Sequence, residues 1–285
     1  MAAPPIAGQT DPVSVSASPD PAIAPFGRAL RVWRERRRLS QLELALAADV
    51  SARHISFVET GRSTPSRVMV LRLAETLDVP PRERNELLIA AGLAPMYPER
   101  PLDHPDLAVV RAGLARVLAA HEPFPCVAVD RQWNVVATND AAGVLLDGVS
   151  PALLERPNAL RIALHPDGLT RRIVNLGEWR HHLLSRLRRE VRACASAELR
   201  ELLTELESYP GPIAPPSDTG AVAVRLEMST AGGDPLSFLS TVTTFGTALD
   251  PTAAELSVET FLPADDATAA ALVCLAKAQG RSPEN

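Results

Sequence analysis

The sequence predicts two domains, an all-α N-terminal domain of five helices and an α+β domain with a five-stranded antiparallel sheet. Between residues 26 and 94, apolar side chains recur at helical spacing between residues that cap helices. From residue 107 onward, short strand-like apolar runs flank a helical middle, a pattern typical of an α+β domain. The length of 285 residues agrees with two domains, because a domain contains roughly 150 residues.

Proline-rich stretches mark the ends of these domains. Residues 1–25 contain six prolines and no apolar periodicity, so we expect a disordered tail. Further prolines lie within 95–106, which we interpret as a linker. The helical domain then covers 26–94, the α+β domain covers 107–278, and residues 279–285 are expected to form a second disordered tail.

The first two helices are predicted from spacing and capping. Leu30 and Trp33 lie at helical spacing in a first helix over 26–38. Ser40 and Glu43 form a capping box, in which the hydroxyl accepts from the third amide and the carboxylate reaches back to the cap amide. The second helix therefore begins after Ser40 and ends near residue 48.

Three more helices follow within the same domain. Asp49 occupies the turn, and Ser51 caps a third helix that ends before Gly61, a residue suited to a left-handed stop. Ser66 caps a fourth helix, and the fifth spans 82–91. Two short helices joined by a tight turn are the helix-turn-helix geometry.

The third helix has two distinct faces. With an advance of about 100° per residue, Ile55 and Val58 share an apolar face that can pack on the core. The other face presents Ala52, Arg53, Ser56 and Phe57. Because the major groove of DNA admits an α-helix and arginine matches the acceptors of guanine, this face predicts base recognition.

The charge distribution agrees with a local contact to a polyanion. The net charge of the chain is −5. Residues 28–72 nevertheless contain ten Arg against four acidic residues, a local charge of 10 − 4 = +6. Residues 101–285 carry 16 basic and 23 acidic residues, or 16 − 23 = −7. The basic segment therefore coincides with the predicted helix-turn-helix domain.

After the linker, the second domain is predicted to begin with short β-like runs, the first of them at 126–129. A turn separates its first two strands, Asn139 caps the short helix that follows, and the last two helices of the middle are amphipathic. The predicted elements are, in order, strands at 126–129 and 133–138, a short helix to 146, a broken segment at 153–164, helices at 176–193 and 198–207, strands at 222–229, 235–245 and 255–261 with a hairpin loop at 231–234, and a final helix.

The first domain resembles the phage-repressor (Cro/C1, XRE) helix-turn-helix. The matching residues are Leu39-Ser40-Gln41, Glu43-Leu44-Ala45, Val50-Ser51, Ile55-Ser56, Glu59, Gly61, Arg62, Pro65-Ser66 and Leu73-Ala74. The stretch from Arg53 to Arg62 resembles the MmyB-like subgroup of bacterial regulators. One departure is Asp49, where the pattern usually has Gly, but Asp tolerates the left-handed region better than most residues.

This resemblance implies an operator in double-stranded DNA, bound by a homodimer on two half-sites. It implies a structural buried ion pair between Arg34 and Glu59. The DNA-contacting residues that it implies are Gln41, Ala52, Arg53, Ser56, Phe57, Arg62, Ser63, Ser66 and Arg67.

The second half resembles the MmyB-like ligand-binding domain. The matching pieces are Val129-Asp130, Trp133-Asn134, Asn139, 164–168, 172–175, 243–247 and 261–265. The resemblance implies a PAS-like fold and a small effector that is apolar or fatty-acid-like.

Large aromatic side chains and one basic pair are the ligand-binding candidates in this half. Arg161 and His165 lie four residues apart, where a cation would suit a carboxylate head group. The candidates are Trp133, Arg161, His165, Trp179, Phe238, Phe245 and Phe261. The alternative is that the aromatic residues fill the core and that Arg161 pairs with a local acid.

Several other functions are disfavoured. The absence of nucleophile-elbow, P-loop, dinucleotide-binding and His-Glu-x-x-His motifs predicts no enzyme activity, no catalytic residue and no cofactor. Three widely spaced cysteines disfavour disulfides and a zinc site, and no metal is expected. The longest apolar run, 269–276, is far below the roughly 20 residues of a membrane span, and no secretory signal is visible, so we expect a cytoplasmic protein without membrane contact.

Two alternatives for the second domain remain open. In one, it serves only dimerisation or protein docking and binds no effector. In the other, Cys126, Cys194 and Cys274 form a thiol redox sensor, which buried and unreactive thiols would exclude.

Overall fold

The protein is described from a computed structural model that covers residues 25–194, 196–215, 223–230, 235–245 and 250–278. Residues 1–24 of the predicted first tail, the predicted second tail at 279–285 and the predicted hairpin loop at 231–234 lie outside these residues, whereas Pro25 begins the first helix. The chain divides into two compact units. The first ends at Leu77 and includes Ala90–Leu93, and the second comprises Asp78–Ile89 and the chain from Ala94 onward.

Five helices open the chain, as predicted. They are α1 (Pro25–Arg36), α2 (Gln41–Ala47), α3 (Ala52–Glu59), α4 (Arg67–Thr76) and α5 (Pro81–Ala90). The predicted caps are present at three of them. Ser40 and Glu43 form the capping box, with the Ser40 Oγ accepting from the Glu43 amide at 3.1 Å. Ser51 and Ser66 cap α3 and α4 by the same side-chain bond to the third amide.

Two left-handed residues end α2 and α3 where the sequence predicts turns. Asp49 has φ 52° and Gly61 has φ 75°. The amide of Arg62 then donates to the carbonyl of Phe57 at 2.8 Å, which closes the C-terminus of α3. These turns set the two ends of α3.

The core of the first unit is built from the buried faces of α1, α2, α3 and α4. Ile55 and Val58 of α3 are buried as predicted. The remaining buried apolar residues of this core are Phe26, Leu30, Trp33, Leu44, Ala45, Ala48, Val70, Leu73, Ala74 and Leu77.

Gly27 allows α1 and α3 to approach closely. A Cβ at this position would lie 2.6 Å from the carbonyl oxygens of Val58 and Glu59. We therefore expect Gly27→Ala to lower the free energy of unfolding by about 1–3 kcal/mol, measured by urea denaturation. Gly143→Ala is the matched control, because nothing lies within 4 Å of its Cβ, and this helical substitution should be neutral or stabilising. Equal effects of the two would contradict the close-packing explanation.

The second unit contains one antiparallel sheet of five strands in the order β2-β1-β5-β4-β3. The strands are β1 (Cys126–Val129), β2 (Val135–Thr138), β3 (Arg225–Ser229), β4 (Pro235–Thr244) and β5 (Ser257–Pro263). In the centre of the sheet, Val127 of β1 lies opposite Glu259 of β5. The predicted five-stranded α+β domain is confirmed.

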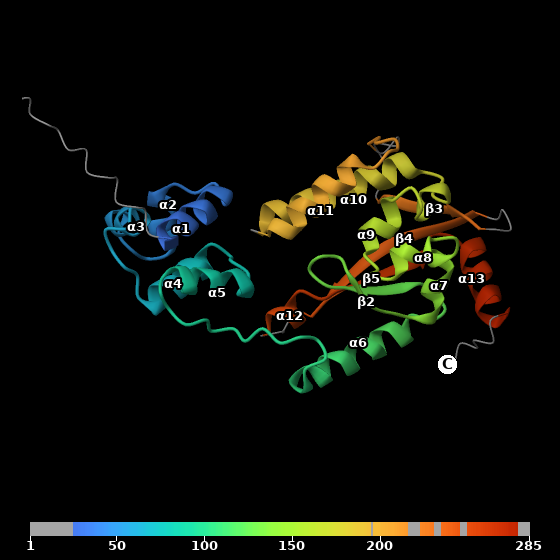
Figure 1. Ribbon diagram of the computed structural model, residues 1–285, viewed down its shortest axis with the longest axis horizontal. Coiled ribbons are helices and arrows are strands. Elements are labelled where there is room, and N and C mark those ends of the chain that lie inside the picture. The colour runs from blue at the N-terminus through green and yellow to red at the C-terminus, as the bar shows by residue number, and fades with distance from the viewer. Residues whose placement is uncertain (1–24, 195, 216–222, 231–234, 246–249, 279–285) are drawn as a thin grey trace, which may run out of the picture. The chain divides into compact units, whose positions relative to one another are not determined.

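Helices cover both faces of this sheet (Figure 1). On one face lies the main core, which includes residues of α9 (Ala159–Leu164), α10 (Leu176–Ala193) and α11 (Ala197–Ser208). On the other face, α6 (Ala108–Ala120) packs Leu114 and Leu118 against a smaller cluster. The remaining elements are η1 (Pro105–Leu107), η2 (Asp140–Ala142), α7 (Gly143–Leu146), α8 (Pro151–Leu154), η3 (Leu169–Arg171), α12 (Pro251–Ala254) and α13 (Asp266–Ala278).

Two strand boundaries expected from the sequence are corrected by the structure, and one helix was not predicted. The helix α6 (Ala108–Ala120) had no predicted counterpart; it buries only two leucines and is otherwise rich in small residues. The strand expected from residue 133 begins at Val135, because Trp133 has a left-handed φ of 65°. The strand expected from residue 255 begins at Ser257, because Asp250 and Pro251 start a short helix there.

Candidate functional site

The exposed side of α3 is the first candidate site. Arg53 is exposed, and Ala52, Ser56 and Phe57 are partly exposed, whereas Ile55 and Val58 face the core. The structure therefore brings together the four α3 residues that the sequence predicts as base contacts. Their sequence spacing alone places them on one side of the helix.

An aromatic ring holds two arginines of this surface. The guanidinium of Arg53 lies 5.1 Å from the centre of the Phe57 ring, and that of Arg62 lies 6.0 Å from it. Cation–π contacts of this kind are worth about 0.5–1 kcal/mol at exposed sites. Phe57 therefore restrains the side chains of Arg53 and Arg62, in addition to being a candidate base contact itself.

Glu59 connects the other side of α3 to two helices. It accepts from Arg34 Nε at 2.6 Å and from Arg34 Nη2 at 3.0 Å, and both side chains are buried, with exposed fractions of 8% for Arg34 and 4% for Glu59. It also accepts from Gln41 Nε2 at 2.7 Å. The bond to Glu59 raises the pKa of Arg34, although burial opposes this shift. The predicted Arg34–Glu59 ion pair is confirmed.

The remaining predicted DNA contacts lie around this helix. Gln41 is the first residue of α2, and its amide group is oriented by Glu59. Arg62 is exposed after α3, and the amide of Ser63 donates to the Phe57 carbonyl. Ser66 caps α4, and Arg67 is its first residue.

The second candidate site is an apolar cavity between the sheet and its helical cover. The space inside it, together with the solvent at its opening, amounts to about 850 Å³. Among its lining side chains only Thr138, His182, Arg186, Ser240 and Glu259 carry charged or hydrogen-bonding groups apart from two indoles. The apolar and indole residues of the lining are Val127, Trp133, Val135, Ala142, Leu145, Leu146, Ala159, Leu160, Ile162, Ala163, Leu169, Trp179, Leu183, Leu226 and Phe261.

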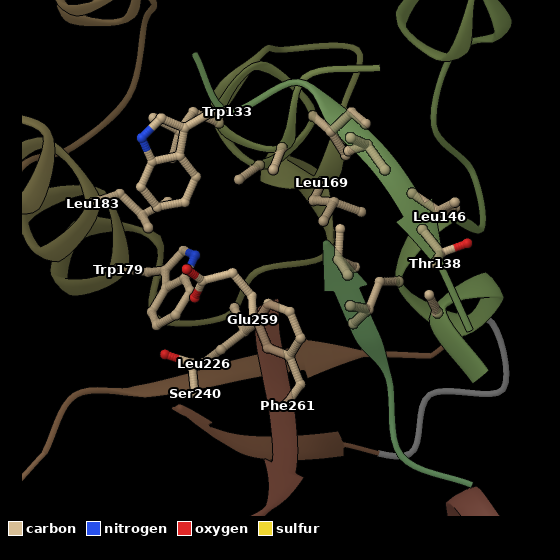
Figure 2. A pocket seen from close by; sticks show the side chains of 18 of the residues that line it. Trp133, Thr138, Leu146, Leu169, Trp179, Leu183, Leu226, Ser240, Glu259 and Phe261 are labelled. Atoms are coloured by element: carbon tan, nitrogen blue, oxygen red, sulfur yellow. The ribbon is translucent and has the colours of Figure 1, made fainter. Parts of the chain in front are cut away.

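One end of the cavity is polar. Glu259 and Ser240 lie near Trp179 and Phe261 on this side (Figure 2). Arg186 of α10 makes a forked pair with Glu259, with Nη2–Oε1 at 2.7 Å and Nη1–Oε2 at 3.1 Å. Burial lowers the pKa of Arg186, but the carboxylates of Glu259 and Glu190 raise it more, so its pKa lies above the ordinary value.

His182 contributes an uncharged ring to the lining. It stacks on Trp179 with ring centres 5.3 Å apart. Burial lowers the pKa of His182, and the neighbouring charges of Arg186 and Arg189 lower it further. Its imidazole is therefore neutral at neutral pH.

Three of the predicted ligand-binding residues line this cavity. They are Trp133, Trp179 and Phe261. Phe238 is fully buried in the core, in edge-to-face contact with Phe261, and does not line the cavity. Phe245 packs with the cluster beneath α6, on the opposite face of the sheet.

The predicted basic pair also lies outside the cavity lining. Arg161 is paired with Glu205 at 2.7 Å, and His165 packs its ring edge-to-face on Tyr209. The contacts therefore support the alternative in which Arg161 pairs with a local acid. His165 caps the end of α9 and is not part of a shared helix face.

The charged residues of the cavity were not predicted from the sequence, although helical spacing on α10 and strand alternation on β5 indicate them. Arg186 lies seven positions after Trp179 on α10, and Glu259 lies two positions before Phe261 on β5. Both spacings place the charged residue on the same face as the aromatic one.

The described part of the chain also bears on metal ligands, reactive thiols and membrane-spanning helices. No group of three or more potential metal ligands occurs among the described residues. Cys126 is buried, and burial raises the pKa of its thiol, which disfavours the thiolate. Cys194 is partly buried and Cys274 is exposed. No helix in the described ranges is both long and apolar enough to cross a membrane.

Comparison with known proteins assigns a family to each part of the chain. The family described as "MmyB-like transcription regulator ligand binding domain" matches residues 110–275, more than half of the chain. The chain belongs to this MmyB-like family. A second family, described as "Helix-turn-helix domain", matches residues 25–87. Both resemblances predicted from the sequence are therefore confirmed.

Relatives of this MmyB-like chain are named as HTH-type transcriptional regulators. It is 33% identical over 129 residues to an uncharacterized HTH-type transcriptional regulator of Mycobacterium tuberculosis, covering 45% of this chain and 43% of that protein. It is 37% identical over 78 residues to the uncharacterized HTH-type transcriptional regulator RghRB of Bacillus subtilis, covering 27% and 54%. The chain thus spans about half the length of the curated relatives it matches.

Two solved structures match short parts of the chain. The restriction-modification controller protein C.AhdI of Aeromonas hydrophila is 38% identical, with a TM-score of 0.21, over 21% of this chain and 92% of that one. The clp gene regulator ClgR of Corynebacterium glutamicum is 29% identical, with a TM-score of 0.22, over 24% and 86%.

Proposed function

We propose that this protein is a transcriptional regulator that binds a specific operator in double-stranded DNA and responds to a small apolar effector. The exposed face of α3 carries the first half of this proposal. It combines a guanidinium held on an aromatic ring with small and hydroxyl side chains, which suits the floor of a major groove. Gln41, Ser63, Ser66, Arg62 and Arg67 surround it as candidate contacts to phosphate or base edges.

The apolar cavity carries the second half. Its lining is mostly aliphatic and aromatic with few polar groups, which is the usual character of small-molecule sites. Trp133, Trp179 and Phe261 are the predicted residues that would contact the effector there. An effector that favours one conformation would change operator affinity, and operator binding would change effector affinity by the same factor.

A homodimer completes the proposal. Helix-turn-helix proteins of this kind bind two half-sites separated by about one turn of DNA. A regulator of this type acts in the cytoplasm, where the bacterial chromosome lies, and needs no cofactor or catalytic residue.

Operator binding is tested by selecting duplexes from a random pool with the full chain at low salt. We expect a recurring motif with two half-sites, and an affinity that falls steeply with salt. Failure to bind any duplex would overturn the DNA-binding half.

Effector binding is tested with N-phenyl-1-naphthylamine, an uncharged probe that fluoresces in apolar surroundings. We expect saturable binding to the full chain, and at least about a tenfold loss for Ala163→Phe, which fills the cavity from α9. Ala152→Phe is the matched control, because α8 buries no residue and Ala152 does not line the cavity. Equal binding to both variants, or none to the unmodified chain, would favour a docking module instead.

A further inference from the structure

The charged side chains that line the polar end of the cavity are Arg186 and Glu259, and Glu190, which does not line the cavity, also pairs with Arg186. Arg186 is the one side chain lining the cavity that carries a positive charge at neutral pH, among the residues that the structure describes. It binds Glu259 through both terminal nitrogens and Glu190 through Nε at 3.2 Å. The guanidinium of Arg186 therefore pairs with two carboxylates at once.

Arg186 is also fixed in place by Trp133. Its guanidinium carbon lies 4.4 Å from the centre of the indole ring, and the indole Nε1 donates to Glu190 Oε2 at 2.8 Å. Trp133, Arg186, Glu190 and Glu259 thus form a closed network. Any movement of Arg186 toward a ligand would have to break this network.

A ligand carboxylate would meet an unfavourable site. Reaching Arg186 would place a third anion around one cation, beside Glu259, whose side chain is only 7% exposed. Displacing Glu259 from Arg186 would leave a buried carboxylate without its cation, which is strongly unfavourable. Both routes oppose an anionic head group.

A hydrogen-bond donor would meet a favourable site. A carboxylate has roughly four acceptor positions, and Arg186 occupies one on each oxygen of Glu259. The hydroxyl of Ser240, which also lines the cavity, can accept or donate beside it (Figure 2). A donating group can therefore add to Glu259 without disturbing the pair with Arg186.

We propose that the effector of this cavity is an apolar molecule whose polar end donates a hydrogen bond to Glu259, and that Glu259 excludes carboxylates. The donor is a hydroxyl or a protonated amine. This inference rests on the proposed function of the cavity as an effector site. It differs from the fatty-acid-like effector that the resemblance implies, because it concerns the charge around Arg186 in this chain.

The test is calorimetric titration of the full chain at neutral pH with n-decanol, decylamine and decanoate, which share one alkyl chain. We expect n-decanol or decylamine to bind at least about tenfold more tightly than decanoate. The stronger of the two identifies the donor as hydroxyl or amine. Decanoate binding as tightly as both others would overturn the inference and leave the effector site intact.

Variants test whether Glu259 causes the preference for n-decanol or decylamine over decanoate. In Glu259→Gln, Arg186 loses its forked carboxylate, so the ratio should shift toward decanoate by about tenfold or more. Glu190→Gln, at a residue whose side chain is 34% exposed, should shift it in the same direction even if Glu259→Gln fails to fold. Glu205→Gln makes the same change at the Arg161 pair outside the cavity and should leave the ratio unchanged.

The outcomes separate this inference from the proposed function. An unchanged ratio in a folded Glu259→Gln variant, together with no shift in Glu190→Gln, would overturn the role of Glu259 alone. If the chain binds N-phenyl-1-naphthylamine but none of the three ligands displaces it, the donor-headed effector is wrong and the apolar site stands. If neither the probe nor any ligand binds, both proposals fail.

Discussion

Glu59→Ala is expected to lower the free energy of unfolding of the helix-turn-helix domain by about 3–5 kcal/mol. The substitution leaves the guanidinium of Arg34 buried without its forked partner, which costs far more than the net value of an ion pair. It also releases the side chain of Gln41 at the start of α2. Urea denaturation followed by circular dichroism measures the loss.

The matched control for Glu59→Ala is Glu207→Ala. Glu207 also pairs with an arginine, Arg188, at 2.6 Å, but its side chain is 42% exposed. Exposed pairs are worth about 0–1 kcal/mol, so this variant should be nearly as stable as the unmodified chain. Comparable losses in the two variants would contradict the special role of the buried pair.

Arg53→Ala is expected to cost about 1–3 kcal/mol of operator binding and to relax the preference for one base. The proposed reason is a forked contact from the guanidinium to guanine, which alanine cannot replace. The unmodified side chain is held over Phe57, so it is partly ordered before DNA binds. Titration of the selected operator, and of the same duplex with each guanine replaced, measures both effects.

Arg62→Ala is the matched control for base recognition. Arg62 lies beyond α3 and also contacts the Phe57 ring, but we propose that it meets the phosphate backbone. Its removal should weaken binding to all duplexes about equally and lower the slope of log affinity against log salt by about one. If Arg53→Ala weakened operator and random DNA equally, Arg53 would not read bases.

Local signals were sufficient for the first domain. Ser40, Ser51 and Ser66 cap helices through bonds that span three residues, and Asp49 and Gly61 end helices through their own backbone preferences. Because these interactions are local, the sequence contains them directly. The buried face of α3 follows from short-range periodicity, and the excess of basic charge follows from the composition of residues 28–72.

The α+β domain was predictable in its strands and long helices but less so at its edges. Helix α10 matches its predicted range, whereas no helix was predicted at the position of α6. The few buried positions of α6 give a weak helical pattern, and its stability comes from packing Leu114 and Leu118 on the sheet. Trp133 looked like a strand residue, but its contacts with Arg186 and Glu190 accompany a left-handed backbone.

By itself, the sequence determined the helix-turn-helix, the exposed face of α3, the sheet, and the aromatic residues that include Trp133, Trp179 and Phe261. Only the tertiary structure decided which of the candidates share a cavity, and that its polar end belongs to Arg186 and Glu259. The physical reason is distance along the chain. Glu259 and Arg186 are 73 residues apart, and no local pattern records that a strand and a helix will bring two opposite charges together inside an apolar wall.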